Sequence, residues 1–474
     1  MIADAQPTTL SESLRRHCVE AVERAKREAR PVVVSLTVDL PSSPDPVQFF
    51  ARGERSGSFR SYWEQRSDGL TFVGIGVARA IRCDGSRPIR DAAAAVREDM
   101  ATALIDDATG ITGGPVYLGG FAFAPDRPAV AEWSGFPSGL LVLPRLLLAV
   151  REGTAALTLS TLVEPDADPD VAAAAALRDF AALRSAELAR GKASGGTGPL
   201  LAVEESPTSS AWKTSVAASV ADIRSGRFEK VVLARSLRLR AGAPFDPVAI
   251  LHRLRDGGPS AYVFAIETAG RCFLGASPER LVRLAGREVE VTCLAGSIAR
   301  GGTEAEDERL ARELLTSDKN RTEHEVVVRS TQAALAAVCA DVQRDPGTPW
   351  VARSRSVQHL ATPLRGCLAH GGCVLDLVDR LHPTPAVGGF PRDVALAAIR
   401  DREAIARGWY AGPVGWVNRS GEGEFAVAIR SALVAGREAT LYAGAGIVAD
   451  SDPEAEYAET RLKLEPMLAA LGAQ

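Results

Sequence analysis

The chain has 474 residues, 46% of them hydrophobic, and a formal net charge of −4. At ~100–200 residues per domain, this length predicts about three domains or one large packed body. The sequence has no basic run interleaved with aromatic residues, no apolar stretch of the ~18 residues that a membrane span needs, and no secretory signal at its N-terminus. We therefore expect neither a nucleic-acid partner nor a membrane partner. Seven scattered cysteines favour a reduced, cytoplasmic protein.

Residues 1–200 are expected to form an N-terminal α/β part. A first helix is predicted within residues 1–30, followed by short runs such as PVVVSLTVDL, LTFVGIGVA and VYLGGFAFA. Their alternating pattern, punctuated by Gly and Pro, favours antiparallel strands. Two further helices are predicted at residues 96–108 and 171–191, and the Gly-, Ser- and Pro-rich residues 191–211 are interpreted as a linker.

Residues 208–468 are expected to form the second part of one intimately packed body. Strand-like runs are interrupted here by a long helix predicted at about residues 304–341, and a last helix is predicted at residues 453–471. Hairpins and helices are mixed without a regular β-α-β alternation. The order therefore predicts an α+β fold with large antiparallel sheets.

Five segments of this second part concentrate chemically useful side chains. They are FEKVVLAR (228–235), GASPERL (275–281), SDKNRTEHEVVV (317–328), LHPTPAVGGFP (381–391) and YAGAGIVADSDPEAEYAETRLKL (442–464). Lys230 begins an apolar strand, where it is either a solvated edge residue or a base that takes a proton from water. Glu279 follows a Ser-Pro turn and is either a surface ion-pair partner or an acid that protonates a leaving hydroxyl.

Carboxylates on two predicted helices indicate a metal site. Glu323 lies in a polar cluster between apolar turns, while Glu456, Glu459 and Lys463 share one face of the last helix. An ordinary surface ladder of Glu and Lys has the same spacing. Carboxylates from separate helices, however, are the oxygen ligands that Mg²⁺ prefers.

The segment YAGAGIVA also fits the pattern G-x-G-x-x-A of dinucleotide-binding proteins. About 25 residues follow Ala449, too few for the second strand and ribose-binding acid that such a site requires. The glycines are better explained by a close approach of backbone N–H groups to an anionic ligand.

Together, the order and spacing of these segments resemble the chorismate-utilising enzymes, a family that includes isochorismate, salicylate, anthranilate and aminodeoxychorismate synthases. The resemblance covers about residues 208–468, and GGFAFAP (119–125) resembles the family's N-terminal part. It implies two large antiparallel sheets around a central cleft, with helices outside. It also implies chorismate as the substrate, Mg²⁺ as the cofactor and a monomeric enzyme.

Within the family, the chain most resembles isochorismate synthases, which are isomerases that serve menaquinone or siderophore synthesis. A lysine in KVVLAR is found in members that add water, whereas ammonia-using members carry another residue there. Ala386, in HPTPAVGG, stands where salicylate-forming members tend to carry threonine. A salicylate synthase is the first alternative. An amine-adding anthranilate or aminodeoxychorismate synthase subunit and a catalytically idle chorismate-binding protein are the others.

The resemblance also implies a role for each matching residue. Lys230 is the base for the water that attacks ring carbon 2, and Glu279 is the acid for the departing 4-hydroxyl. Glu323 and Glu459 are Mg²⁺ ligands, and Glu456 holds a water of the metal. Tyr410 and Arg430 bind the enolpyruvyl carboxylate. The remaining substrate-binding positions implied by the resemblance are Gly296, Ser297, His359, Ala386, Gly444, Ala445, Gly446 and Lys463.

Overall fold

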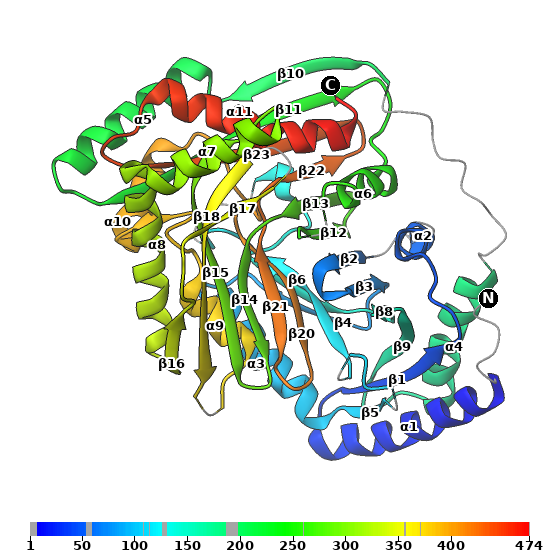
Figure 1. Ribbon diagram of the computed structural model, residues 1–474. Coiled ribbons are helices and arrows are strands. Elements are labelled where there is room, and N and C mark those ends of the chain that lie inside the picture. Colours follow the sequence, from blue (N-terminus) through cyan, green and yellow to red (C-terminus); the bar gives the residue numbers. More distant parts are fainter. Residues whose placement is uncertain are drawn as a thin grey trace.

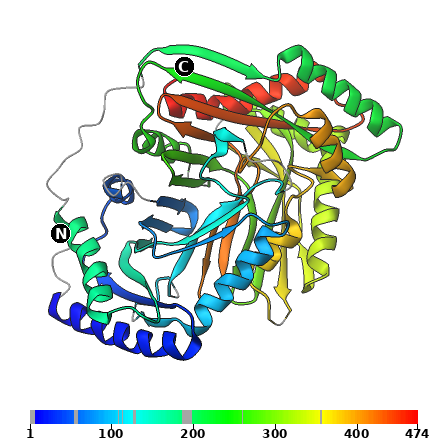
Figure 2. The same ribbon diagram turned by 180° about the vertical axis from the view of Figure 1, so that it is seen from behind.

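The computed structural model describes residues 7–53, 59–107, 109–112, 114–125, 130–185, 198–258, 260–354, 357–369 and 371–473. Two large sheets stack against each other in this part of the chain, and helices cover their outer sides (Figures 1 and 2). The predicted α+β class with large, mostly antiparallel sheets is confirmed. None of the described helices is both long enough and apolar enough to cross a membrane.

The larger sheet joins strands from both halves of the chain. Among the described residues it has 13 strands, in the spatial order β10 (Leu200–Ser206), β11 (Lys230–Ala241), β23 (Glu438–Ile447), β22 (Ser431–Ala435), β13 (Arg271–Ser277), β12 (Tyr262–Thr268), β2 (Arg60–Gln65), β3 (Leu70–Ile75), β8 (Leu146–Arg151), β9 (Thr154–Val163), β1 (Val32–Leu40) and β5 (Leu104–Asp107), with β19 (Gly389–Phe390) beside β11. β12 pairs with β2, so the N-terminal strands continue the sheet of the C-terminal strands.

The second sheet has ten strands among the described residues. Their spatial order is β16 (Cys339–Arg344), β18 (Val357–Leu368), β15 (Glu288–Ala299), β14 (Arg280–Ala285), β21 (Gly423–Val427), β20 (Pro413–Asn418), β6 (Val116–Phe121), β7 (Gly139–Leu143) and β4 (Arg79–Cys83), with β17 (Trp350–Arg353) beside β18. β6, from the N-terminal half, pairs with β20 from the C-terminal half. Both sheets therefore tie the two halves together.

The helices of the described residues are α1 (Pro7–Glu28), α2 (Pro46–Arg52), α3 (Pro88–Thr102), α4 (Pro169–Ser185), α5 (Ser209–Arg224), α6 (Pro247–Arg255), α7 (Glu304–Thr316), α8 (Asp318–Ala336), α9 (Val374–Leu381), α10 (Arg392–Arg402) and α11 (Pro453–Leu471). α8 packs against β15, β16 and β18 of the smaller sheet, whereas α11 packs against β23 of the larger one. In Figure 1, α8 lies at the left beside the smaller sheet, and α11 lies across the top near β23.

Two apolar cores hold these layers together. One contains inward-facing side chains of both sheets, such as Trp63, Phe72, Tyr117 and Leu141. The other lies between the larger sheet and the helices α1, α2, α4, α6 and α11. Because a buried apolar side chain stabilises the fold by ~1.5–3 kcal/mol, each layer is held on its inner face by many such contributions.

Three boundaries differ from the prediction. The helix predicted at 96–108 begins earlier and ends at Thr102, because residues 104–107 form β5, which pairs in parallel with β1. The long helix predicted at 304–341 is two helices. They meet at Ser317, whose side chain accepts a hydrogen bond from the Asn320 N–H and so caps α8.

The third difference concerns the predicted linker at 191–211. Residues 191–197 lie outside the described part of the chain. Residues 200–206 form β10 at the edge of the larger sheet, with Glu204 opposite Arg238 and Ser206 opposite Ser236. Its mostly exposed side chains, which include Leu201 and Val203, gave no alternating pattern, and only the pairing with β11 makes it a strand.

Candidate active site

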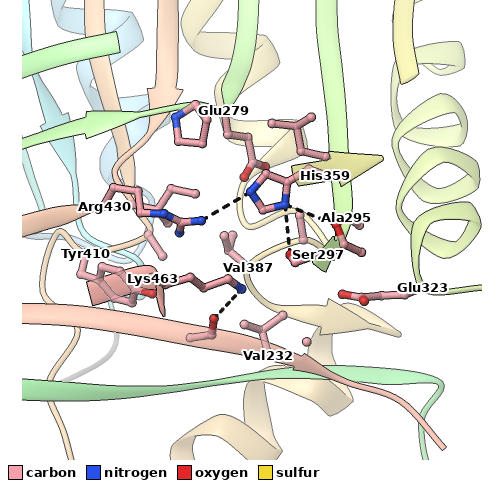
Figure 3. A pocket seen from close by; sticks show the side chains of 18 of the residues that line it. Val232, Glu279, Ala295, Ser297, Glu323, His359, Val387, Tyr410, Arg430 and Lys463 are labelled. Carbon is pink, nitrogen blue, oxygen red and sulfur yellow. Dashed lines mark hydrogen bonds between the residues drawn. The ribbon is translucent and has the colours of Figure 1, made fainter. Parts of the chain in front are cut away.

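A cavity of about 60 Å³ is lined by residues of both sheets (Figure 3). Val232 of β11 and the glycines Gly444 and Gly446 of β23 form one side. Gly296, from β15, belongs to the opposite sheet.

Lys230 lies directly behind this cavity. Its side chain is fully buried, and its ammonium nitrogen is 3.0 Å from Glu323 Oε1 of α8. No acceptor among the described residues meets this nitrogen in good hydrogen-bond geometry. A Cβ at Gly446 would come 2.2 Å from Glu323 Oε1 and 3.0 Å from Lys230 Cε, so the glycine leaves the space that this pair needs. A buried ammonium with an unused donor is suited to bind a water molecule or a ligand.

The other predicted metal ligands also face lysines. Glu456 is buried and lies 2.6 Å from the ammonium of Lys319, and Glu459 pairs with Lys463. Burial alone would lower the pKa of Lys319, but attraction to Glu456, Glu323 and Glu459 outweighs burial and raises it. The three carboxylates therefore act on one cationic group.

These carboxylates do not form a finished metal site. In the described part of the chain, no three His, Cys, Asp or Glu side chains are grouped closely enough to hold a metal ion. Burial and repulsion from Glu459 raise the pKa of Glu456, despite its lysine partner. The donors are hard carboxylate oxygens, which suit Mg²⁺ chemically, although each carboxylate is paired with a different lysine.

Glu279 lies in the turn between β13 and β14, on the far side of the cavity from Val232 (Figure 3). Its backbone N–H donates to Ser277 Oγ and its carbonyl accepts from the Val427 N–H, which fixes the turn. Burial raises the pKa of the Glu279 carboxyl to about 7, against the opposing attraction of Lys230, Arg430 and Lys463. A carboxyl with this pKa holds a proton during part of its time at neutral pH and can donate it.

His359 of β18 is held as a neutral ring with a defined tautomer. Arg430 donates to its Nε2 over 3.4 Å, and a guanidinium can only donate. The proton is therefore on Nδ1, which lies 3.3 Å from the Gly296 carbonyl and 3.0 Å from Ser297 Oγ. Burial, with Arg430 and Lys463 nearby, lowers the pKa of His359 to about 3. The histidine thus orients Arg430 and does not carry a charge of its own.

Tyr410 and Arg430 lie beside each other at the end of the cavity (Figure 3). The Tyr410 ring stacks on Tyr442 with centroids 5.1 Å apart, and burial raises the pKa of its hydroxyl to about 12, so it remains a donor. Arg430 and Ala411, which also line the cavity, have positive φ angles of 51° and 61°. A non-glycine residue in this region is strained, and such strain is often found at functional sites.

Most of the predicted site residues line the cavity: Glu279, Gly296, Ser297, Glu323, His359, Ala386, Tyr410, Arg430, Gly444, Gly446 and Lys463. Lys230, Ala445, Glu456 and Glu459 are not part of the lining. Ala445 stands between two glycines that face the cavity, so strand alternation places its methyl group on the opposite face of β23. Lys463 donates to the Gly444 carbonyl over 2.9 Å.

Two charged residues near the cavity were missed by the sequence analysis. Lys319 stands in the quoted segment SDKNRTEHEVVV but was not considered, although a lysine four residues before Glu323 lies on the same helix face. Arg407 lines the cavity and lies outside the five segments. Its sequence context, AIARGWY, carries no pattern that predicts a buried arginine.

Comparisons with known proteins identify the family of this chain. A sequence model of the family described as "chorismate binding enzyme" matches residues 20–472. The chain is 36% identical over 475 residues to the isochorismate synthase MenF of Bacillus subtilis, covering 98% of this chain and 99% of that protein. It is 38% identical over 462 residues to the salicylate biosynthesis isochorismate synthase of Pseudomonas aeruginosa, with coverages of 97% and 94%.

A solved structure shows the same fold. The menaquinone-specific isochorismate synthase MenF from Escherichia coli superposes with a TM-score of 0.79 at 27% sequence identity, covering 96% of this chain and 99% of that one. This match confirms the fold expected from the five segments. The chain therefore belongs to the family of chorismate-binding enzymes.

Proposed function

We propose that this chain is an isochorismate synthase, an isomerase that interconverts chorismate and isochorismate. The observation that carries the proposal is the arrangement of two groups around one cavity. Lys230, buried with an unused donor, lies behind the β11 side, and Glu279, with a pKa raised to about 7, lies across from it. The full-length relatives with 36% and 38% identity are both named isochorismate synthases, which supports the proposal.

The reaction requires a proton acceptor and a proton donor on opposite faces of the ring. In the proposed mechanism Lys230, as the neutral amine, takes a proton from the water that attacks ring carbon 2 and becomes an ammonium. Glu279 gives its proton to the 4-hydroxyl, which leaves as water. In the reverse direction the two residues exchange roles, because the forward and reverse reactions pass through the same transition state. No oxidant or reductant is needed.

The two carboxylates of chorismate require separate cationic partners. We assign the enolpyruvyl carboxylate to Arg430 and the Tyr410 hydroxyl, since a guanidinium oriented by His359 presents parallel donors to a carboxylate. The ring carboxylate is assigned to the side where Lys463, Gly296 and Ser297 line the cavity. Ala386 lies against the ring, where it offers no hydroxyl to the bound product.

Mg²⁺ is part of the proposal. Glu323 and Glu459 would hold the ion directly, and Glu456 would hold one of its waters. The ion supplies positive charge for the ring carboxylate. The proposed Mg²⁺ site is supported by the attraction of these three carboxylates to Lys319, whose pKa all three raise.

One assay tests the function. Chorismate is incubated with the protein and Mg²⁺, and the products are separated by liquid chromatography. We expect isochorismate as the main product and no activity after chelation of Mg²⁺. Salicylate as the main product would identify a salicylate synthase, and a product formed only with ammonia would identify an amine-adding enzyme. Absence of turnover would indicate a binding protein.

A further inference from the structure

The strand that begins with Lys230 lacks a continuous partner on one of its edges. β23 pairs with β11 from Val231 to Arg240 along one edge. Along the other edge, β19 pairs with Lys230 and Val231, the Val232 N–H donates to the Gly388 carbonyl, and pairing with β10 starts at Ser236, opposite Ser206. Among the described strands, none pairs with residues 232–235 on this edge, so the Val232 carbonyl and the Ala234 N–H have no strand partner. Unpaired backbone groups in a buried strand are costly, so this gap needs another partner.

An ion pair of two side chains closes the gap. The Ala234 N–H donates to Glu403 Oε1 over 2.8 Å, and Arg407 Nη2 donates to the Val232 carbonyl over 2.8 Å. The two side chains also bind each other, with Arg407 Nε 2.9 Å from Glu403 Oε2. Their side chains are only 3% and 2% exposed. The Glu403 carboxylate thus takes the place of a C=O group of a neighbouring strand, and the Arg407 guanidinium takes the place of an N–H group.

The same arginine binds the loop that leads into β19 beside β11. Arg407 Nη1 donates to the Val387 carbonyl over 2.8 Å, and its guanidinium lies 4.1 Å from the centre of the Phe123 ring. Val232 and Val387 both line the cavity. Lys230 is two residues before Val232, and Ala386 directly precedes Val387. One guanidinium therefore fixes the distance between the strand of the proposed base and the loop beside the substrate ring.

We propose that Glu403 and Arg407 are positioning residues, which hold the Lys230 strand and the Ala386–Val387 loop in register for the reaction. The proposal rests on the isochorismate synthase function proposed above. The two positions are not interchangeable. The Ala234 N–H requires an acceptor at position 403, whereas the Val232 and Val387 carbonyls require donors at position 407. An ion pair that served only to stabilise the fold would work in either orientation.

The first variant is Arg407→Lys, which keeps the charge but lacks the planar fork that reaches two carbonyls and a carboxylate at once. We expect kcat to fall ~10- to 100-fold, since a misplacement of about 1 Å has such an effect. The KM for chorismate should change less than about threefold, because Arg430, Tyr410 and Lys463 stand on other elements. A wild-type kcat in Arg407→Lys would overturn the proposal.

The control is Arg402→Gln. Arg402 immediately precedes Glu403 and also forms an ion pair, with Asp222 of α5, but it contacts neither β11 nor the cavity. We expect this variant to keep the wild-type kcat even where its melting temperature falls. A loss of kcat as large as that of Arg407→Lys would mean that any ion pair near α10 has this effect, and would contradict the proposal.

Two further variants keep the test decisive if Arg407→Lys folds poorly. Glu403→Gln retains an acceptor for the Ala234 N–H and should keep more activity than Glu403→Ala; equal kcat values would contradict the hydrogen-bonding role. The double exchange Glu403→Arg with Arg407→Glu keeps an ion pair but places a carboxylate against the Val232 carbonyl. We expect it to be inactive, and wild-type activity in it would overturn the proposal.

Hydrogen exchange separates this proposal from the proposed function. The amide of Ala234 should exchange faster in Arg407→Lys and in Glu403→Ala than in the wild type, and should be unchanged in Arg402→Gln. This readout does not depend on turnover. If the wild type makes no isochorismate but the exchange pattern holds, the proposed function is wrong and the positioning role of Glu403 and Arg407 stands. Unchanged exchange of the Ala234 amide in the Arg407 and Glu403 variants would overturn this positioning role.

Discussion

The cavity has two walls that differ in how they hold charge. The paired wall consists of Glu323 and Lys463, which line the cavity, together with their neighbours Lys230, Lys319, Glu456 and Glu459, which do not. Each of its glutamates lies within ion-pair distance of a lysine. The buried wall consists of Glu279, His359, Tyr410 and Arg430, where no described ion pair is formed and burial is the largest influence on each pKa.

Exposure alone does not explain this difference, because side chains of both walls are largely buried. Glu323 has a lysine 3.0 Å away, whereas Glu279 feels only the longer-range attraction of Lys230, Arg430 and Lys463. Desolvation therefore decides the pKa of Glu279 and makes it a proton donor near pH 7. The comparison shows that a buried glutamate without an ion-pair partner, such as Glu279, is shifted toward its protonated form by desolvation.

The largest expected effect is on the paired wall, at Lys230. We predict that Lys230→Ala, and the more conservative Lys230→Met, lower kcat by ~10²–10⁴-fold, since each removes the general base. Chorismate and Mg²⁺ should still bind, which calorimetric titration measures. Lys213→Ala, which breaks the exposed ion pair with Glu454, is the control and should leave kcat unchanged. More than half of the wild-type kcat in either Lys230 variant would exclude the assignment.

The next effect is on the buried wall, at Glu279. We predict that Glu279→Gln lowers kcat by ~10²-fold or more, because the amide cannot donate a transferable proton. In the wild type, activity should decline as pH rises through about 7, since the acid must be protonated. If the residual activity of Glu279→Gln still declines as pH rises through about 7, the decline belongs to a group other than Glu279.

Glu279 also links stability to pH. Its pKa is raised from 4.5 to about 7 in the folded protein, so its contribution is fully present below about pH 4.5 and is lost as pH rises through 7. The melting temperature of Glu279→Gln, relative to the wild type, should therefore rise between pH 5 and pH 8. A constant difference across this range would show that the carboxyl is not desolvated.

A smaller effect is expected for the metal ligands of the paired wall. We predict that Glu323→Gln and Glu459→Gln each raise the Mg²⁺ concentration for half-maximal activity by ~10-fold or more, because each removes a charged oxygen ligand. Direct Mg²⁺ titration by calorimetry should show the same shift. Glu454→Gln, on the exposed side of α11, is the matched control. Unchanged Mg²⁺ curves for both variants would exclude these carboxylates as ligands.

The smallest expected effect concerns the ring contact between the walls. We predict that Ala386→Thr diverts a minor part of the product to salicylate, because the added hydroxyl reaches the bound isochorismate or a water beside it. Salicylate fluorescence over time measures the effect. The shift should be small, since neighbouring side chains also position the ring. No salicylate in the variant would show that Ala386 alone does not decide product release.

Much of the fold and site was predictable because the responsible signals are local. Period-two alternation indicated the strands, and the segments KVVLAR and SPER placed Lys230 and Glu279 at strand ends, where the structure has them. The helix at 453–471 was confirmed in its bounds. Ser317, in contrast, divides a continuous helical pattern by capping α8, and the pattern of apolar residues alone does not reveal such a break.

What the sequence by itself determined is the α+β class, the family resemblance and the set of reactive side chains, because these depend on residue types and short spacings. The tertiary structure alone decided which glutamate lies beside a lysine and which is left to desolvation. It also made β10 a strand and brought Glu403 and Arg407 to the open edge of β11. These features depend on contacts between separate segments, with 30 positions between Ser206 and Ser236 and 169 between Ala234 and Glu403, and no local pattern encodes the distance between them.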